Sequence, residues 1–267
     1  ANRFCLSGFL LAAMHRSSQR MDLCMASSTR GPVTVLLTTS SSCIMMSDPG
    51  KQTQRQMERL NINMLDTIRQ DFPILNQKVH NKPLIYLDSA ASAQKPQAVM
   101  DSMLHYYQHD NANVHRGAHT LGDRATHDFE AARDTVQKFI NAPTRKEIIW
   151  TKGTTEAINL IANGLANRLT KGDEIIVSGM EHHANIVPWQ MLAERTGAIL
   201  RVLEVNAQGE LDHAQFLELI NSKTKILSMT HVSNVLGTIN PVKHYIDTAK
   251  ASNIITVIDG AQAVPHF

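Results

Sequence analysis

Residues 254–264 read Ile-Ile-Thr-Val-Ile-Asp-Gly-Ala-Gln-Ala-Val, and this stretch decides the class of fold. Five apolar or β-branched residues run without interruption up to Asp259 and Gly260. Continuous runs of this kind are typical of strands that are buried on both faces, as in parallel sheets. Open α/β sheets bind their ligands at the carboxyl ends of such strands. Asp259 is therefore a candidate ligand-binding residue at the edge of a parallel sheet.

Asp259 has two interpretations at this point. A fixed, buried carboxylate in this place would keep the ring nitrogen of pyridoxal phosphate (PLP) protonated, so that the ring can accept electrons from a substrate. The other interpretation is structural, because an aspartate at the end of a strand often caps the following turn. The stretch alone favours neither, and the decision depends on what the neighbouring strands carry.

Predicted strands and helices alternate along most of the chain. The expected strands are 147–151, 174–178, 199–204, 225–230 and 254–258, and the helices between them are 156–169, 186–195, 214–220 and 242–251. Before them come a helix over 57–70, a strand over 84–87, a helix over 96–107 and a longer helix with the apolar stripe Ala125, Phe129, Ala132, Val136 and Phe139. This alternation predicts βαβ units, and therefore an α/β fold with a mainly parallel sheet and helices on both faces.

The composition is that of an ordinary globular protein. The 267 residues are 43% hydrophobic and 19% charged, with a formal net charge of +2. So small a charge argues against nucleic acid or an anionic membrane as a partner, and no apolar run reaches the roughly 18 residues that a membrane span needs. The three cysteines, Cys5, Cys24 and Cys43, all precede the predicted sheet. A globular part without disulfides fits a reducing compartment such as the cytoplasm.

Residues 1–56 differ from the rest of the chain. They are rich in Ser, Thr and Met, and before Asp48 their only acidic residue is Asp22. Three interpretations are open: a disordered extension, sequence upstream of the true start, or a transit peptide that directs the protein to an organelle. We expect this segment to lie outside the folded unit, which we assign to residues 57–267.

A candidate phosphate site follows the predicted strand 147–151. The residues Lys152-Gly153-Thr154-Thr155-Glu156 open a helix. Threonine hydroxyls beside the unpaired N–H groups at the positive end of a helix can bind a phosphate, and plain capping of the helix is the alternative. No GxGxxG or GxxxxGK[ST] motif occurs, which argues against a dinucleotide or a nucleoside triphosphate.

Two further predicted strands end in polar residues. The segment Met180-Glu181-His182-His183-Ala184-Asn185 follows strand 174–178, and His231-Val232-Ser233-Asn234 follows strand 225–230. An imidazole in such a place can stack on a flat ring or transfer protons, although only one of two adjacent histidines can face a single site. The convergence of polar strand ends predicts one binding site. A metal site is not expected, because HExxH is absent and no cysteine is near.

Six motifs together resemble one known family. In chain order they are Tyr86-Leu-Asp-Ser-Ala-Ala-Ser, Asn113-Val-His-Arg-Gly, Gly153-Thr-Thr-Glu, Glu181-His-His-Ala-Asn-Ile-Val-Pro-Trp189, His231-Val-Ser-Asn-Val-Leu-Gly-Thr238 and Asp259-Gly-Ala-Gln262. Their order and spacing are similar to those of the N-terminal part of SufS-type (group II) cysteine desulfurases, which are PLP enzymes of aminotransferase class V. The match runs from about Asp71 to Phe267. The resemblance implies the large domain of the PLP-dependent transferases of fold type I.

The resemblance also implies a role for each matching residue. It implies six cofactor contacts: Thr154 and Thr155 to the phosphate, His182 stacked on the ring and active in proton transfer, Asp259 to the pyridine nitrogen, Gln262 to the phenolic oxygen, and Asn234 near that oxygen. It implies substrate contacts from Asn234, which would reach the substrate carboxylate, and from the residues that line the entrance, Ala90, Ala91, His115 and Arg116. No metal ligand is implied.

The implied reaction removes sulfur from L-cysteine, or from L-selenocysteine its selenium, and leaves L-alanine. The sulfur would form a persulfide on an enzyme cysteine and pass to a SufE-like acceptor for iron–sulfur cluster assembly, and the full-length enzyme would be a homodimer. Two alternatives are open. One is another class V enzyme, such as a selenocysteine lyase or a kynureninase-like hydrolase, and the other is a non-catalytic protein that only dimerises or binds a partner.

Some motifs of the family are not found in this chain. The lysine that binds PLP covalently, in a Ser-Gly-His-Lys stretch, and the nucleophilic cysteine follow the Asp-Gly-Ala-Gln motif in this family, and neither occurs before Phe267. The resemblance therefore implies an N-terminal fragment, in which the large domain is truncated and the small C-terminal domain is absent. We expect that the chain as written does not turn over cysteine.

Overall fold

The structure is a computed structural model, and it describes residues 24–25, 34–37 and 65–266. These residues divide into two compact units. The first unit contains residues 65–135, and the second contains residues 24–25, 34–37 and 136–266. The sheet predicted from the sequence lies in the second unit.

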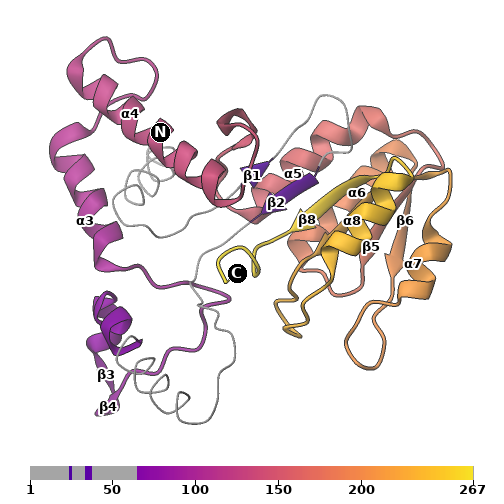
Figure 1. Cartoon of the computed structure of the whole chain (residues 1–267), viewed down its shortest axis with the longest axis horizontal. Helices are drawn as coiled ribbons and strands as arrows, with labels where there is room; N and C mark the ends of the chain where they lie inside the picture. Colours follow the sequence, from indigo (N-terminus) through magenta and orange to yellow (C-terminus); the bar gives the residue numbers. More distant parts are fainter. Residues whose placement is uncertain (1–23, 26–33, 38–64, 267) are drawn as a thin grey trace, which may run out of the picture. The chain divides into compact units, whose positions relative to one another are not determined.

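The second unit is built on a six-stranded sheet (Figure 1). Its strands in spatial order are β1 (Cys24–Met25), β2 (Thr34–Leu37), β8 (Ile255–Asp259), β7 (Thr224–Thr230), β5 (Glu174–Ser178) and β6 (Ile199–Leu203). Neighbouring strands run parallel, except that β1 and β2 pair antiparallel. Every residue of β5 is buried. Burial on both faces explains why Ile175, Ile176 and Val177 are consecutive apolar residues, rather than apolar residues that alternate with polar ones.

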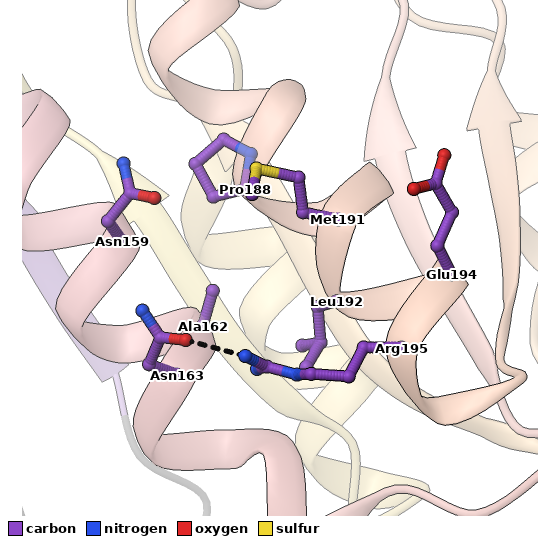
Figure 2. Close-up of a pocket in the computed structure, with 8 residues that line it drawn as sticks. All are labelled: Asn159, Ala162, Asn163, Pro188, Met191, Leu192, Glu194 and Arg195. Atoms are coloured by element: carbon purple, nitrogen blue, oxygen red, sulfur yellow. Dashed lines mark hydrogen bonds between the residues drawn. The ribbon is translucent and has the colours of Figure 1, made fainter.

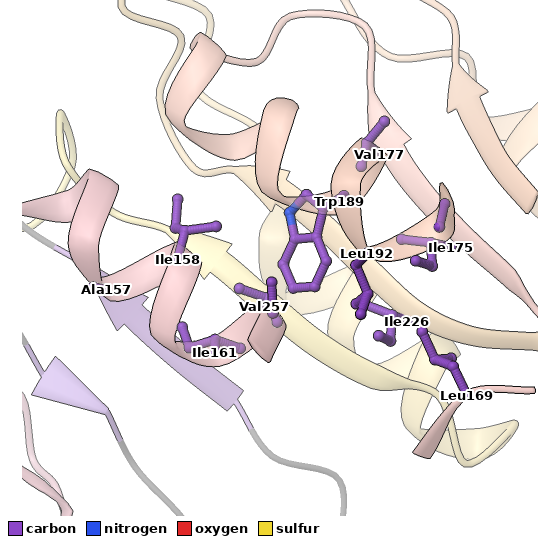
Figure 3. Close-up of a cluster of buried hydrophobic side chains, with 12 residues drawn as sticks. Ala157, Ile158, Ile161, Leu169, Ile175, Val177, Trp189, Leu192, Ile226 and Val257 are labelled. Carbon is purple, nitrogen blue, oxygen red and sulfur yellow. The ribbon is translucent and has the colours of Figure 1, made fainter. Parts of the chain in front are cut away.

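One face of the sheet packs against helices α5 (Thr154–Leu165) and α6 (Val187–Thr196). Trp189 of α6 is fully buried in this layer, as Figure 3 shows. The strand residues in the same cluster are Ile175, Val177, Ile226 and Val257. Successive strand residues point to opposite faces, so these four residues define the face that the two helices cover.

The opposite face packs against helices α7 (His213–Leu219) and α8 (Val242–Ala251). The strand residues in this cluster are the alternate ones, namely Ile176, Leu203, Leu227, Met229 and Ile258. Phe216 of α7 and Tyr245 of α8 pack edge to face, with their ring centroids 4.7 Å apart. Helices therefore cover both faces of a mainly parallel sheet, as the sequence predicted.

The ends of the helices follow from local sequence. Pro188 lies in the first turn of α6, where a missing N–H group leaves no intrahelical hydrogen bond unmade. Gly197 ends the same helix with a φ angle of 74°, the left-handed conformation that glycine adopts most readily. Asp212 caps α7, because its side chain accepts a hydrogen bond from the Gln215 N–H at 3.1 Å.

The first unit is mainly helical. Residues 65–70 are helical, α3 (Gln97–His105) continues into a π-helical turn (Tyr106–Asp110), and α4 (Thr120–Phe139) begins here and ends in the second unit. Two short strands, β3 (Lys78–Val79) and β4 (Lys82–Pro83), form a hairpin. Next to α4, a Cβ atom on Gly117 would lie 2.6 Å from the Cα of Gly122. Only glycine fits at such a close approach of two backbone segments.

Two predicted strands are wrong. Residues 84–87 have no regular structure, and Ile85 and Leu87 are 78% and 90% exposed. In place of the strand 147–151, a 3₁₀ turn (Arg145–Glu147) leads into extended residues that belong to neither sheet. Both segments have residue types that favour strands, but a strand also needs the backbone groups of a neighbour. The other predicted strands, and the helices from residue 96 onward, are confirmed to within a few residues.

Strand β2 lies in the segment that was expected outside the folded unit. Its backbone pairs in parallel with Thr256–Asp259 of β8. A Thr-Val-Leu-Leu run favours strand pairing, and β8 offers it an edge. The assignment of the folded unit to residues 57–267 stays a prediction. The rest of this segment, and residues 57–64 of the helix predicted over 57–70, lie outside the described residues.

Candidate functional site

Three neighbouring strands end at the same edge of the sheet. Strands β5, β7 and β8 run parallel, and their last residues, Ser178, Thr230 and Asp259, are buried. Thr230 lies opposite Asp259 in the ladder, and the Asp259 carbonyl accepts a hydrogen bond from the His231 N–H at 2.9 Å. The segments that follow these strands carry His182, Asn234 and Gln262. The fold thus places several predicted site segments at one edge, where α/β sheets bind ligands.

Asp259 is a buried carboxylate, only 4% exposed. Its Oδ1 accepts a hydrogen bond from the Ala261 N–H at 2.9 Å, which is the turn-capping contact considered above. Burial raises the pKa of Asp259, whereas the hydrogen bond from the Ala261 N–H and the nearby imidazole of His182 act in the opposite direction. A cationic partner would favour the charged form of this buried carboxylate. A protonated pyridine nitrogen is such a partner.

His182 is exposed and is held by its own loop. Its Nδ1 accepts a hydrogen bond from the Ala184 N–H at 3.1 Å and so caps the 3₁₀ turn His183–Asn185. Because Nδ1 is an acceptor, the proton of the neutral ring lies on Nε2. The His183 ring is perpendicular to it, at a centroid distance of 6.1 Å. Of the two histidines, His182 is the one that lowers the pKa of Asp259, and its role as the site residue stays a prediction.

Thr154 is the first residue of α5, and its hydroxyl has no partner. The oxygen Oγ1 is buried and makes no hydrogen bond with the described residues. The helix also has no side-chain cap at its N-cap residue Gly153. A buried hydroxyl without a partner is unfavourable, and the N-terminus of a helix attracts anions. Thr154, with the exposed Thr155 beside it, therefore fits a phosphate group.

Gly153 allows this helix to begin where it does. Its φ and ψ angles are 155° and 176°, a region open almost only to glycine. We expect Gly153→Ala to lower the free energy of unfolding by about 1–3 kcal/mol. Gly164 provides a matched control, because it lies inside the same helix and an added Cβ atom would meet only open space there. Gly164→Ala should raise the free energy of unfolding by about 0.5–1 kcal/mol. Urea unfolding measures both, and shifts of the same sign would contradict the assignment.

Asn234 and Gln262 lie in the turns that follow β7 and β8. Asn234 is exposed in a turn in which the Ser233 hydroxyl accepts hydrogen bonds from the Val235 and Leu236 N–H groups, at 3.3 and 3.1 Å. Gln262 is half-buried in the turn after Asp259. Both turns begin at the candidate edge of the sheet, and the roles of the two side chains stay predictions.

The residues predicted at the substrate entrance belong to the first unit. Ala90 and Ala91 are exposed there. His115 has a φ angle of 65°, and its Nε2 lies 3.1 Å from Oε1 of Glu130 on α4. Its ring also packs edge to face on Phe129, at a centroid distance of 5.5 Å. His115 is therefore held against α4, and its contact with a substrate stays a prediction. For Arg116, the substrate role likewise stays a prediction.

Sequence reasoning missed one residue of this edge, Glu181. The side chain of Glu181 contacts the ends of both β5 and β7 through hydrogen bonds. The signal was present in the sequence as a carboxylate directly before the two histidines, but its partner at Thr230 lies 49 residues away. Such a long-range contact cannot be predicted from local pattern.

A pocket of about 420 Å³ lies between α5 and α6 (Figure 2). Across it, Asn163 Oδ1 accepts a hydrogen bond from Arg195 Nη1 at 3.0 Å. None of its lining residues is a predicted site residue, so it is a different feature from the strand-end site. Among the described residues, no group of three or more His, Cys, Asp or Glu side chains could hold a metal ion.

Comparison with known proteins identifies the class and the family. The solved structures that resemble this chain include PLP-dependent cysteine desulfurases, which confirms the predicted α/β fold. The family described as "Aminotransferase class-V" matches residues 85–267. The chain therefore belongs to the aminotransferase class-V family, whose members depend on PLP.

Its relatives are cysteine desulfurases of about twice the matched length. A probable cysteine desulfurase of Synechocystis is 49% identical over 202 residues, which cover 75% of this chain and 48% of the relative. A cysteine desulfurase of Yersinia pestis is 52% identical over 203 residues, which cover 76% and 50%.

Solved structures give the same result. The cysteine desulfurase CsdA of Escherichia coli is 42% identical with a TM-score of 0.67, and the match covers 76% of this chain and 50% of that one. The enzyme of Thermococcus onnurineus is 36% identical with a TM-score of 0.70, and the match covers 75% and 49%. The chain thus spans about half the length of the curated relatives and solved structures that it matches.

Proposed function

We propose that the whole protein containing this chain is a PLP-dependent cysteine desulfurase. The observation that carries the proposal is the buried Asp259 at the end of β8, beside His182 and at the edge where β5 and β7 also end. Helix α5, with the unpartnered Thr154 hydroxyl, contacts the turn His183–Asn185 that follows β5. A phosphate-binding helix N-terminus, an imidazole and a buried carboxylate are three of the groups that would hold PLP, beside the covalently bound lysine that the family carries further along the chain.

The residues present fit this cofactor. PLP, when bound, supplies a ring that accepts electrons from the substrate. Thr154 and Thr155 would donate their hydroxyls to the phosphate at the positive end of α5. Asp259 would hold the proton on the pyridine nitrogen, and His182 would stack on the ring and hold a proton on Nε2 for transfer. Gln262 and Asn234 would contact the phenolic oxygen, and Asn234 also the substrate carboxylate.

The proposed substrate is L-cysteine, with L-selenocysteine as an alternative. The names of the relatives support it, and so does a solved structure titled SspA in complex with cysteine, which is 30% identical with a TM-score of 0.62 and matches 67% of this chain and 51% of that one. We further propose the SufS-type branch, a SufE-like sulfur acceptor, a role in iron–sulfur cluster assembly, a homodimer and a cytoplasmic location. In the described part of the chain, no helix has the length and apolar character needed to cross a membrane.

The test is a substrate assay on the full-length protein with PLP. L-Cysteine, L-selenocysteine and kynurenine are supplied separately with dithiothreitol, whose thiols reduce the enzyme persulfide, and alanine formation is measured, with the sulfide released by that reduction as a second product from cysteine. The proposal expects PLP-dependent alanine and sulfide from cysteine. Alanine from kynurenine alone would favour a kynureninase-like hydrolase, and alanine from selenocysteine alone a selenocysteine lyase. A PLP-loaded protein that forms no alanine from any of them would contradict the proposal.

A further inference from the structure

We propose that Glu181 is the positioning residue of the strand-end site, where its carboxyl group ties the loop that carries His182 to the ends of β5 and β7. The effect on catalysis rests on the proposed function, whereas the tether itself rests on geometry alone. Glu181 comes directly before His182 in the chain, so whatever fixes its side chain also fixes the backbone from which the imidazole projects.

The contacts of Glu181 reach three separate segments. Its Oε1 accepts hydrogen bonds from the Thr230 N–H, at 2.6 Å, and from the Ser178 hydroxyl. Its Oε2 accepts a hydrogen bond from the Asn185 side-chain amide, at 2.6 Å. Thr230 ends β7, Ser178 ends β5, and Asn185 ends the turn after the two histidines. One carboxyl group therefore connects the ends of β5 and β7 to Asn185, which lies on the other side of the two histidines.

The network continues to the indole of Trp189. Asn185 Oδ1 accepts hydrogen bonds from Trp189 Nε1 at 2.8 Å and from the Ser228 hydroxyl at 2.6 Å. Asn185, Trp189 and Ser228 are each 0% exposed. Buried polar groups with all their partners in place specify one arrangement. A change in the protonation of Glu181 therefore alters the environment of the buried Trp189 indole, because the side-chain amide of Asn185 contacts both.

The electrostatic surroundings make this tether responsive to protons. Burial raises the pKa of Glu181 to about 7, the charge of Asp259 on β8 adds to this, and the three hydrogen-bond donors act in the opposite direction. The other titratable groups near this edge are the loop residues His182 and His183, and His231 after β7. Above the pKa of Glu181, its carboxylate accepts hydrogen bonds from all three donors. Below that pKa, the added proton occupies one of the roughly four lone-pair positions of the carboxyl group and removes its negative charge, which weakens the charge-assisted hydrogen bonds from the three donors.

The raised pKa of Glu181 makes the free energy of unfolding depend on pH. Between the ordinary pKa of 4.5 and about 7, the folded state holds a proton on Glu181 that the unfolded state has released. Stability therefore falls as the pH rises through this window. A shift of this size corresponds to a change on the order of 100-fold in the folding equilibrium constant. Glu181→Gln should lack this component of the pH dependence.

The direct test uses the fluorescence of Trp189. The chain contains two tryptophans, so Trp150→Phe leaves Trp189 as the only one. In that background we expect the emission to titrate between about pH 5.5 and about pH 8.5 with a midpoint near 7, and we expect the transition to vanish in Glu181→Gln, which has the same shape without the ionisation. A flat titration in the parent protein, or an unchanged midpoint in Glu181→Gln, would overturn the tether.

Histidine variants keep the test decisive if Glu181→Gln does not fold. His182→Ala and His183→Ala change exposed side chains, and His231→Ala removes the remaining nearby imidazole. A midpoint near 7 that survives in all three and also in Asp259→Asn assigns the transition to the carboxyl group of Glu181. A midpoint that disappears in any of these variants assigns it to the residue replaced there and overturns the proposal.

Comparing kcat with KM in the full-length protein shows whether Glu181 positions His182 or only stabilises the fold. Because a misplaced imidazole transfers protons poorly, Glu181→Gln should lower kcat about 10-fold or more while KM for cysteine changes less than about threefold. A normal kcat in this variant would overturn the positioning role. If the fluorescence transition is present but no protein forms alanine, the tether stands and the proposed function fails.

Discussion

Replacing Asp259 by alanine in the full-length protein is expected to lower turnover of cysteine by about 100-fold or more. The carboxylate is proposed to stabilise charge that develops on the cofactor ring, and removing one such electrostatic contact typically costs on the order of 100-fold in kcat. Asp259 is only 4% exposed, so water cannot replace the lost charge. PLP should be retained better than activity is, because the phosphate contacts from Thr154 and Thr155 remain. Alanine formation at saturating cysteine and PLP measures the effect.

Two further variants show whether charge is the cause. Asp259→Asn keeps an acceptor for the Ala261 N–H but removes the charge, so it should lose nearly as much turnover as the alanine variant. Asp247→Asn is the matched control, because Asp247 lies exposed on α8 and pairs with Lys243. Its turnover should stay within about twofold of the parent, as is usual for an exposed ion pair. Near-normal turnover in Asp259→Ala would remove Asp259 from the site.

The largest expected loss of stability comes from Trp189→Ala, at about 3–5 kcal/mol in the free energy of unfolding. Trp189 is 0% exposed in the layer between the sheet and α6, and its Nε1 donates to the buried Asn185. The substitution leaves both a cavity and an amide oxygen with one hydrogen bond fewer. Urea unfolding of the chain measures it.

Met191 supplies the control for this variant. It lies on the same helix but is 60% exposed. Met191→Ala should change the free energy of unfolding by no more than about 0.5 kcal/mol. A loss below about 1 kcal/mol in Trp189→Ala, or equal losses in the two variants, would contradict the packing in Figure 3.

The central strands could be predicted because strands that are buried on both faces consist mostly of apolar and β-branched residues. Residues 175–177 are consecutive apolar residues, residues 254–258 are all apolar or β-branched, and both segments lie in strands that pair with parallel neighbours. The helical stripe was readable too, since Ala125, Ala132 and Val136 of α4 are buried. The candidate edge followed from these elements, because polar residues directly after parallel strands must meet at one side of the sheet.

What could not be predicted depends on partners that are distant in the sequence. Residues 84–87 and 147–151 have strand-like composition, but among the described residues they pair with no strand of either sheet. The local sequence does not show whether a segment will find a partner strand. Strand β2 shows the converse, because its pairing with β8 joins segments more than two hundred residues apart. Glu181 was missed for the same reason, since its contact to Thr230 spans 49 residues.

The central claim is that Asp259 holds the proton on the ring nitrogen of bound PLP. The most direct measurement is the ¹⁵N chemical shift of PLP labelled at that nitrogen and bound to the full-length protein, at about pH 8, where the nitrogen of a free pyridine is unprotonated. We expect the shift of a protonated nitrogen in the parent protein and of an unprotonated one in Asp259→Ala. An unprotonated nitrogen in the parent protein, or a protonated one in Asp259→Ala, would contradict it.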